Sequence, residues 1–286
     1  MSDHRDDPIP PDAAPDATVL AVRGAVVERR PDRLAGEEPL QILAHGPGAA
    51  AVEVAVTMRT PGDETELAAG FLCSEGLAAP DALRGARFTF GDPARMSRPH
   101  DEVTVALPVP FDTGAVAQRT AIATASCGIC GKASIDDVAL RCGVLPPGPV
   151  IARSVLRSLP DAMRAAQAVF ARTGGLHAVA RFRPDGTLVA LREDVGRHNA
   201  FDKLVGAAIL AGEMPLHGSL VLVSGRVSFE IVQKAAIAGI PFLAAVSAPT
   251  DLAVETARRT GLTLVGFLRE DGFNVYAGEE RVDLAG

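Results

Sequence analysis

From about residue 154 to the end of the chain, short apolar runs alternate with stretches whose apolar residues recur at helical spacing. The apolar runs are GLHAVARF, TLVALRED, SLVLVSG, PFLAAVS and LTLVGFL, followed by FNVYAG. The predicted helices are DAMRAAQAVFART, NAFDKLVGAAILAG, FEIVQKAAIAG and DLAVETARRTG. Strands that alternate with helices of about 10 to 14 residues predict an α/β domain over residues 151–286, with three layers and a mixed, largely parallel sheet.

The first half of the chain has a different pattern, which predicts a smaller α+β or β-rich part over residues 19–150. The segments TVLAVRGAVVERR and AAVEVAVTM alternate like strands, and residues 65–72 fit a helix with Leu67, Phe71 and Leu72 toward the core. Residues 1–18 are acidic and rich in proline, so we expect a disordered tail.

Composition narrows the function classes. The net charge of −7 argues against a nucleic acid held by bulk electrostatics. The chain has no run of 18 or more apolar residues, which predicts no membrane span. The N-terminus lacks the basic-then-apolar pattern of a signal peptide. Together with a closely spaced C-x-x-C pair, this predicts a cytoplasmic protein.

Four loops follow predicted strands of the α/β domain, and three of them contain an arginine. They are Asp194–Asn199, Gly225–Ser228, Ser247–Asp251 and Leu268–Gly272, with Arg197, Arg226 and Arg269. In open α/β sheets, ligands bind outside the carboxyl ends of parallel strands. Arginines beside helix N-termini there predict a phosphate site. The alternative is that Ser228, Asp251 and Asn199 only cap helices.

The segment SCGICGK places Cys127 and Cys130 three positions apart between glycines. A structural zinc site needs four ligands, and the remaining cysteines, Cys73 and Cys142, show no paired spacing. A deaminase-type zinc site would use His100 and Glu102, but Ser126 replaces the proline of that motif. A thioredoxin-like centre is a further alternative, although no strongly buried strand precedes the pair. A carrier thiol, activated by Lys132 and backbone N–H groups, fits the flanking glycines better.

Other polar residues have simpler interpretations. His177 lies in an apolar strand, where we expect a hydrogen-bonded core histidine. His198 adjoins Arg197, so we expect it to bind a ligand or activate a cysteine. Lys203 and Lys234 fit solvated helix faces, and Asp63 and Glu66 fit helix caps.

Six motifs in the same order make the chain resemble the formate dehydrogenase accessory sulfurtransferases of the FdhD/NarQ family. They are MRTPGDETELAAGFLCSEG (58–76), SCGICGK (126–132), TGGLHAVA (173–180), REDVGRHNAFDKLVG (192–206), VSGRVSFEIVQKAAIAGIP (223–241) and SAPTDLAVETA (247–257). The resemblance implies a cytidine-deaminase-like fold without the deaminase zinc chemistry, and a homodimer.

The resemblance also implies a function. Such a protein takes sulfur from a cysteine desulfurase as a persulfide and delivers it to the molybdenum bis(molybdopterin guanine dinucleotide) cofactor of formate dehydrogenase. Cys127 matches the cysteine that carries the persulfide, and Cys130 its partner. The segment FLREDG matches the cofactor-contacting loop, with residues Phe267, Leu268, Arg269, Glu270, Asp271 and Gly272. From the other loops we add Arg197, His198, Gly225, Arg226 and Ser247 as predicted cofactor-binding residues.

Two alternatives stay open. One is a chaperone that binds the same guanine-nucleotide cofactor without moving sulfur. The other is a zinc hydrolase of the deaminase type.

Overall fold

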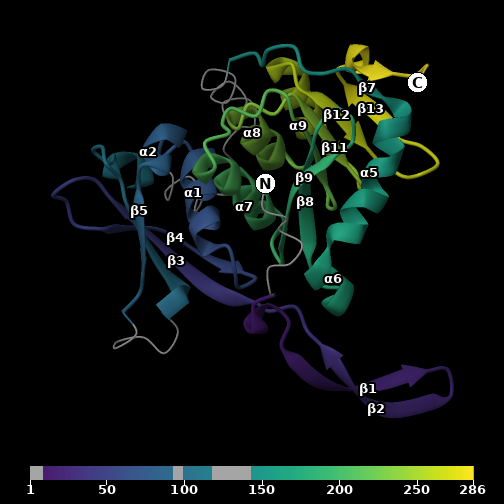
Figure 1. The fold of residues 1–286 in the computed structure, drawn as a ribbon, viewed down its shortest axis with the longest axis horizontal. Coiled ribbons are helices and arrows are strands. Elements are labelled where there is room, and N and C mark those ends of the chain that lie inside the picture. The colour runs from purple at the N-terminus through teal and green to yellow at the C-terminus, as the bar shows by residue number, and fades with distance from the viewer. Residues whose placement is uncertain (1–8, 93–98, 118–142, 286) are drawn as a thin grey trace.

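The computed structural model describes residues 9–92, 99–117 and 143–285 (Figure 1). In the N-terminal part the elements are β1 (Asp16–Arg23), β2 (Val26–Arg33), β3 (Glu38–His45), β4 (Val52–Arg59), α1 (Glu64–Ser74), α2 (Pro80–Arg84), β5 (Arg87–Phe90) and β6 (Glu102–Ala106). After residue 150 they are β7 (Ile151–Ala152), α5 (Arg153–Ala166), α6 (Ala168–Thr173), β8 (His177–Phe182), β9 (Leu188–Asp194), α7 (Arg197–Leu210), β10 (Leu220–Val223), α8 (Phe229–Ile237), β11 (Phe242–Ala245), α9 (Asp251–Thr260), β12 (Thr263–Gly266), β13 (Asn274–Ala277) and β14 (Val282–Asp283).

A six-stranded mixed sheet in the order β13-β12-β11-β10-β8-β9 forms the centre of the C-terminal half. Figure 1 shows α7, α8 and α9 on one face of this sheet and α5 on the other. Two core clusters match these faces: one joins alternate strand residues to the three helices, and the other joins the remaining strand residues to α5. The predicted three-layer α/β arrangement is therefore present; a kinship with cytidine deaminases stays a prediction.

The prediction of a largely parallel sheet is wrong. Within the six-stranded sheet, the β10–β11 and β11–β12 pairs are parallel, whereas the β8–β9, β8–β10 and β12–β13 pairs are antiparallel. The short connection at residues 184–187, with the turn sequence PDGT, explains the antiparallel β8–β9 pair, since a turn of this length can join only antiparallel neighbours. Gly186 has a φ of 85° there, and the Asp185 carboxylate accepts from the N–H of Thr187. Parallel pairing is thus confined to strands that are separated by helices.

The N-terminal part contains a second, four-stranded sheet in the order β4-β3-β6-β5, and α1 contributes Leu67, Phe71 and Leu72 to its core as predicted. The disordered tail was predicted to extend to residue 18, but β1 already begins at Asp16. The helix expected at 161–173 already begins at Arg153 and breaks at Gln167 into α5 and α6.

The α1 and α7 helices cross at two glycines, with their backbones in contact. A Cβ atom on Gly70 would lie 1.8 Å from the carbonyl oxygen of Asp202, and one on Gly206 would lie 1.8 Å from that of Glu66. Both distances are far below any tolerated Cβ contact, so only glycine allows this approach. The core cluster consequently runs from β3 in the first half to β12 in the second, across the expected domain boundary at residue 150.

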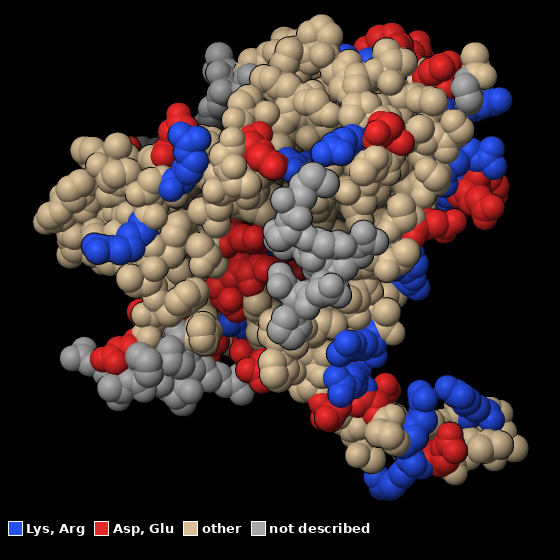
Figure 2. All heavy atoms as spheres, viewed as in Figure 1, with Lys and Arg blue, Asp and Glu red and all other residues tan. Residues whose placement is uncertain are grey.

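The β1–β2 ribbon projects from the body as an arm (Figure 1). Leu20, Val22 and Val27 are more than half exposed, and none of them belongs to either core cluster. Figure 2 shows basic and acidic side chains interspersed along the same ribbon. Among the helices that the structure describes, none combines the length and apolarity needed to cross a bilayer.

We predict that Gly206→Ala will destabilise the protein strongly, by about 3 kcal/mol or more, because the added methyl group meets backbone atoms that cannot rotate away. Urea denaturation of the two proteins measures the difference. Gly218→Ala is the matched control, since a Cβ there meets nothing within 4 Å and its φ is not positive. A Gly206 variant as stable as the control would contradict the predicted close crossing.

Candidate functional site

Four loops gather at one edge of the six-stranded sheet. Because β9 is antiparallel to β8 and β8 is antiparallel to β10, β9 runs in the same direction as β10, β11 and β12. The carboxyl ends of these four strands therefore share one edge, which we call the rim. Backbone bonds link three of its loops: Val227 N–H to Ala248 C=O (3.1 Å), Thr250 N–H to Val227 C=O (2.9 Å) and Phe267 N–H to Ser247 C=O (3.1 Å).

The predicted residues of the FLREDG loop differ in access to the rim. Phe267 is 42% exposed and has a φ of 52°, in the left-handed region. Arg269 and Gly272 exchange backbone bonds in a turn, and Arg269, Glu270 and Asp271 are exposed. The prediction that Leu268 binds the cofactor is wrong for its side chain. That side chain is fully buried in the core cluster on the α5 face of the sheet, so it cannot contact a ligand.

The first turn of α7 brings Arg197 and His198 to the rim. Gly196 is the N-cap residue, so the predicted cap role of Asn199 is wrong; Asn199 lies within the helix. Asp251 likewise begins α9 as its first residue, and Thr250 is the N-cap. His198 Nε2 lies 3.7 Å from Glu230 of α8, and burial lowers the pKa of His198 although Glu230 opposes this effect.

His177 also lies at the rim, which the sequence interpretation missed. A Cβ atom on Gly225 would lie 3.2 Å from Nδ1 of His177 and 3.8 Å from Cδ of Arg197. These three residues come from β8, the loop after β10 and α7. The signal was the sequence PDGT at residues 184–187, which favours a hairpin turn. Because β9 returns along β8, the start of β8 lies beside the end of β9.

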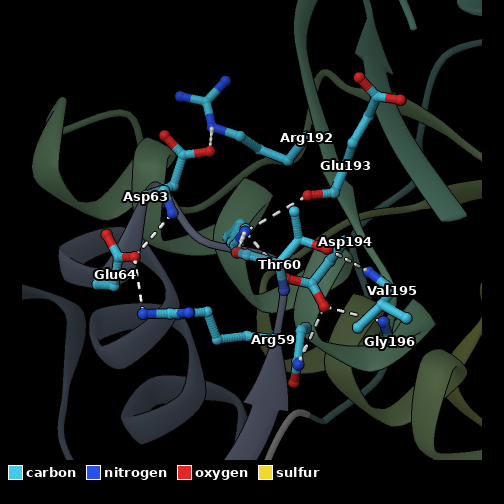
Figure 3. Close-up of polar contacts among 12 residues, drawn as sticks. Arg59, Thr60, Asp63, Glu64, Arg192, Glu193, Asp194, Val195 and Gly196 are labelled. Carbon is cyan, nitrogen blue, oxygen red and sulfur yellow. Dashed lines mark hydrogen bonds and ion pairs between the residues drawn. The ribbon is translucent and has the colours of Figure 1, made fainter. Parts of the chain in front are cut away.

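A buried ionic cluster supports the rim from beneath. Asp194 is fully buried, and its Oδ2 lies 2.9 Å from Nζ of Lys203 and 3.1 Å from the backbone N of Thr60. Its Oδ1 accepts from Gly196 N–H (2.8 Å) and from the Asn199 amide (3.1 Å). Figure 3 shows Thr60 and Asp194 side by side, where the turn before α1 meets the end of β9. The prediction that Lys203 is solvated is wrong, since its side chain is only 1% exposed.

Arginines fix the surroundings of this cluster. Arg59 is fully buried and contacts Glu64 at 3.3 Å (Figure 3). It also contacts Glu38 at 3.2 Å and Asp101 at 3.3 Å. Arg192 pairs with both oxygens of Glu66, at 2.5 and 2.7 Å. Glu66 is thus a bridging residue between α1 and β9 rather than a helix cap. Within the described ranges, no group of three or more His, Cys, Asp or Glu side chains is placed to hold a metal ion.

A second buried pair lies between α7 and α8. Lys234 Nζ contacts both oxygens of Asp202, at 2.8 and 2.9 Å, and Glu75 at 3.3 Å. Burial disfavours the charged form of Lys234, but the two carboxylates outweigh it and raise the pKa of Lys234. The expected solvated position of Lys234 is therefore also wrong. Burial also raises the pKa of Asp202, against the opposing effect of Lys234, and the contact between the two side chains bonds the two helices together.

Cys73, at the end of α1, is the neighbour of this pair. It is 3% exposed, and burial, reinforced by Asp202, raises the pKa of its thiol to about 11. It lines a cavity of about 540 Å³ together with His217 and Gly239. His217 precedes β10 and Gly239 follows α8, so the cavity lies at the edge of the sheet opposite the rim. The cavity is therefore separate from the predicted site.

The predicted Cys127 and Cys130 lie outside the described residues, as does Lys132. The described flanks on either side, Val116 and Leu145, are both buried in the larger core cluster. Leu145 donates its N–H to the carbonyl of Thr260, at the end of α9.

The rim has the properties of an anion site. Arg226 and Arg269 are exposed, Arg197 is partly buried, and Ser247 and Gly225 lie between them along the loops. The first N–H groups of α7, α8 and α9 have no carbonyl partner within their own helices, and these groups favour anions. The arrangement can therefore hold phosphates along the edge of the sheet.

Comparison with known proteins gives a consistent result. A family model described as the FdhD/NarQ family matches residues 35–283. The chain is 51% identical over 271 residues to the sulfur carrier protein FdhD of Streptomyces avermitilis, covering 93% of this chain and 94% of that one. It is 48% identical over 261 residues to the sulfur carrier protein FdhD of Mycobacterium tuberculosis, covering 88% and 92%.

A solved structure has a similar fold. The crystal structure of a formate dehydrogenase accessory protein from Desulfotalea psychrophila superposes with a TM-score of 0.70 at 22% identity, covering 95% of this chain and 100% of that one.

We predict that Lys203→Met will cost about 3–5 kcal/mol of stability, because it leaves the buried Asp194 carboxylate without its counter-ion. Urea denaturation measures the loss. The double variant Lys203→Met/Asp194→Asn should recover part of it, as a double-mutant cycle would show. A loss below about 1 kcal/mol in the single variant would mean that the pair is not buried as described.

We predict that Cys73 will resist iodoacetamide at pH 8 in the folded protein. With a pKa of about 11, on the order of one thiol in a thousand is the reactive thiolate at that pH. Peptide mapping by mass spectrometry reads the modification, and labelling in urea provides the positive control. Extensive labelling of Cys73 in the folded state at pH 8 would contradict the raised pKa.

Proposed function

The chain belongs to the FdhD/NarQ family, and from this premise we propose that it is a sulfurtransferase that carries a persulfide on Cys127 to a molybdenum cofactor. The proposed sulfur donor is a cysteine desulfurase, and the proposed sulfur acceptor is the molybdenum bis(molybdopterin guanine dinucleotide) cofactor of formate dehydrogenase. The proposal includes a cytoplasmic homodimer. The strongest support for the sulfur-carrier role is the 51% sequence identity to a protein named as a sulfur carrier, over nearly the full length of both chains.

The rim supports the cofactor part of the proposal. A bis-guanine dinucleotide carries two diphosphates, which need several cationic or N–H donors. Arg226, Arg269 and Arg197 extend along the edge of one sheet, and the partly exposed Ser247 lies among them. A guanidinium binds phosphate oxygens in pairs, which suits this ligand better than a lysine point charge does.

The chain length around Cys127 is compatible with transfer to the rim. Cys127 follows Ala117, the last described residue before it, by ten residues, and an extended chain of that length spans roughly 33–36 Å. A compact protein of this size has a radius of gyration of roughly 19 Å. Ten residues therefore set only an upper limit on the distance between Cys127 and Ala117, and this limit exceeds the radius of the molecule.

The proposed transfer is a thiol-exchange type of step. The S–S bond of the persulfide breaks, and the Cys127 thiolate is the leaving group. The terminal sulfur becomes a sulfido ligand of the substrate metal, and a reduced metal centre supplies the two electrons that this requires. Cys130 is the proposed partner of Cys127 in the same segment.

We predict that Cys127→Ala will bind GDP as the unaltered protein does but will gain no sulfur from a cysteine desulfurase and cysteine. Intact-mass spectrometry detects the added sulfur atom, and reconstituted formate dehydrogenase activity measures its delivery. Cys73→Ala is the control and should retain both, because Cys73 is buried and protonated. Full maturation by Cys127→Ala would refute the proposal; GDP binding with no sulfur gain in the unaltered protein would favour the cofactor chaperone.

A further inference from the structure

The backbone ladder between β8 and β10 continues into the rim and ends at His177. Val179 pairs with Val223, and beyond them Ser224 donates its N–H to the carbonyl of Ala178 at 3.0 Å. The Ser224 hydroxyl accepts from the N–H of Ala178 at 2.9 Å. The following residue, Gly225, therefore lies directly against the His177 ring, with no side chain of its own between the ring and the rim.

Each element around His177 contributes a defined charge. From α7, Arg197 is permanently cationic. From β9, Asp194 is anionic but paired with Lys203. From the loop after β10, Gly225 contributes none, and Arg226 is exposed. Burial lowers the pKa of His177, Arg197 lowers it further, and Asp194 opposes both effects.

Arg197 still has bonding capacity. Its Nε is buried and makes no hydrogen bond with any residue that the structure describes. A buried donor without a partner is costly, and an anion beside it would satisfy it. The first N–H groups of α7 lie at the same helix end.

We propose that Arg197, Gly225 and His177 form a proton-coupled anion subsite, in which a phosphate-type anion binds Arg197 and His177 takes up a proton. The inference rests on the proposed function only in identifying the anion as a diphosphate of the cofactor. It adds His177, which the sequence assigned to the core, and it adds a regulation of the site by pH.

The coupling follows from the charges. An anion on Arg197 cancels the positive charge that disfavours the imidazolium and gives the protonated ring an acceptor. The pKa of His177 consequently rises on binding. Affinity is lowest above the pKa of the bound state, increases as pH falls between the two values, and is greatest below the pKa of the free state. A rise of about one unit strengthens binding about tenfold at the acidic end.

The test follows the imidazole signal of His177 by NMR in the full chain, with and without sodium sulfate. Sulfate is a suitable probe because its own charge is constant over the range in which histidine titrates, about pH 5 to 8. The chain has six histidines, and the spectrum of His177→Gln assigns the signal. We expect a pKa below 6.5 without sulfate and an increase of about one unit with it.

Calorimetry with GDP and with sulfate at several pH values tests the same subsite by affinity. His177→Gln should bind both anions with a weaker dependence on pH, whereas His217→Gln, at the opposite edge of the sheet, should behave like the unaltered protein. Gly225→Ala should weaken binding, because the new methyl group would lie 3.2 Å from Nδ1 of His177, between the ring and the bound anion. Gly218→Ala should not.

The outcomes separate the two proposals. If GDP binds but the pKa of His177 does not move, the subsite is refuted and the sulfur-carrier proposal is unaffected. If neither anion binds the chain, the subsite is also refuted, and the proposed function then depends on whether Cys127 acquires sulfur. If His177 responds to sulfate but Cys127 gains no sulfur, the subsite is supported and sulfur carriage is refuted.

Discussion

The contact between the α1 and α7 backbones determines how the two halves of this protein fit together. Gly70 and Gly206 each face a carbonyl of the opposite helix, and no other residue type leaves room for that approach. The crossing places Ser74 against Asp202 and Glu66 against Arg192. The four-stranded sheet, which packs on α1, is thereby fixed relative to the six-stranded sheet, which packs on α7. The end of β4 consequently meets the end of β9, where the rim begins.

Buried charge then defines the position of the rim residues. A buried ion pair is weak evidence of added stability, because an apolar replacement of similar volume is often as stable. Its value here is geometric, because the two Asp194 oxygens bond Thr60 in the turn before α1, Gly196 at the N-cap of α7, and Asn199 and Lys203 within α7. The start of α7 is thus held from below, and Arg197 and His198 project from a helix end that has little freedom to shift. A site that holds a charged ligand benefits from donors that are already in place.

Much of the fold could be predicted from periodicity, because apolar runs and helical spacing depend on local sequence. The strands from His177 to Gly266 and the helices between them were predicted, as was the gathering of four loops at one edge. The share of antiparallel pairs in the sheet was not predicted, since pairing partners are chosen by tertiary packing. His177 was assigned to the core because it begins an apolar run, and such a run does not show that this end of β8 lies at the rim. Lys203 and Lys234 were misplaced for a related reason: helical spacing shows which residues share a face, but not that a second helix covers it. Leu268 was assigned by its position in a loop motif, while its apolar side chain packs inward.

The β1–β2 arm stands apart from this network of contacts. It ends before residue 35, where the match to the family model starts, and none of its side chains enters either core cluster. Leu20, Val22 and Val27 keep more than half of their surface open. Substitutions at these three positions should therefore change the free energy of unfolding little. Selection on these side chains would therefore act mainly through contacts that they make outside this chain.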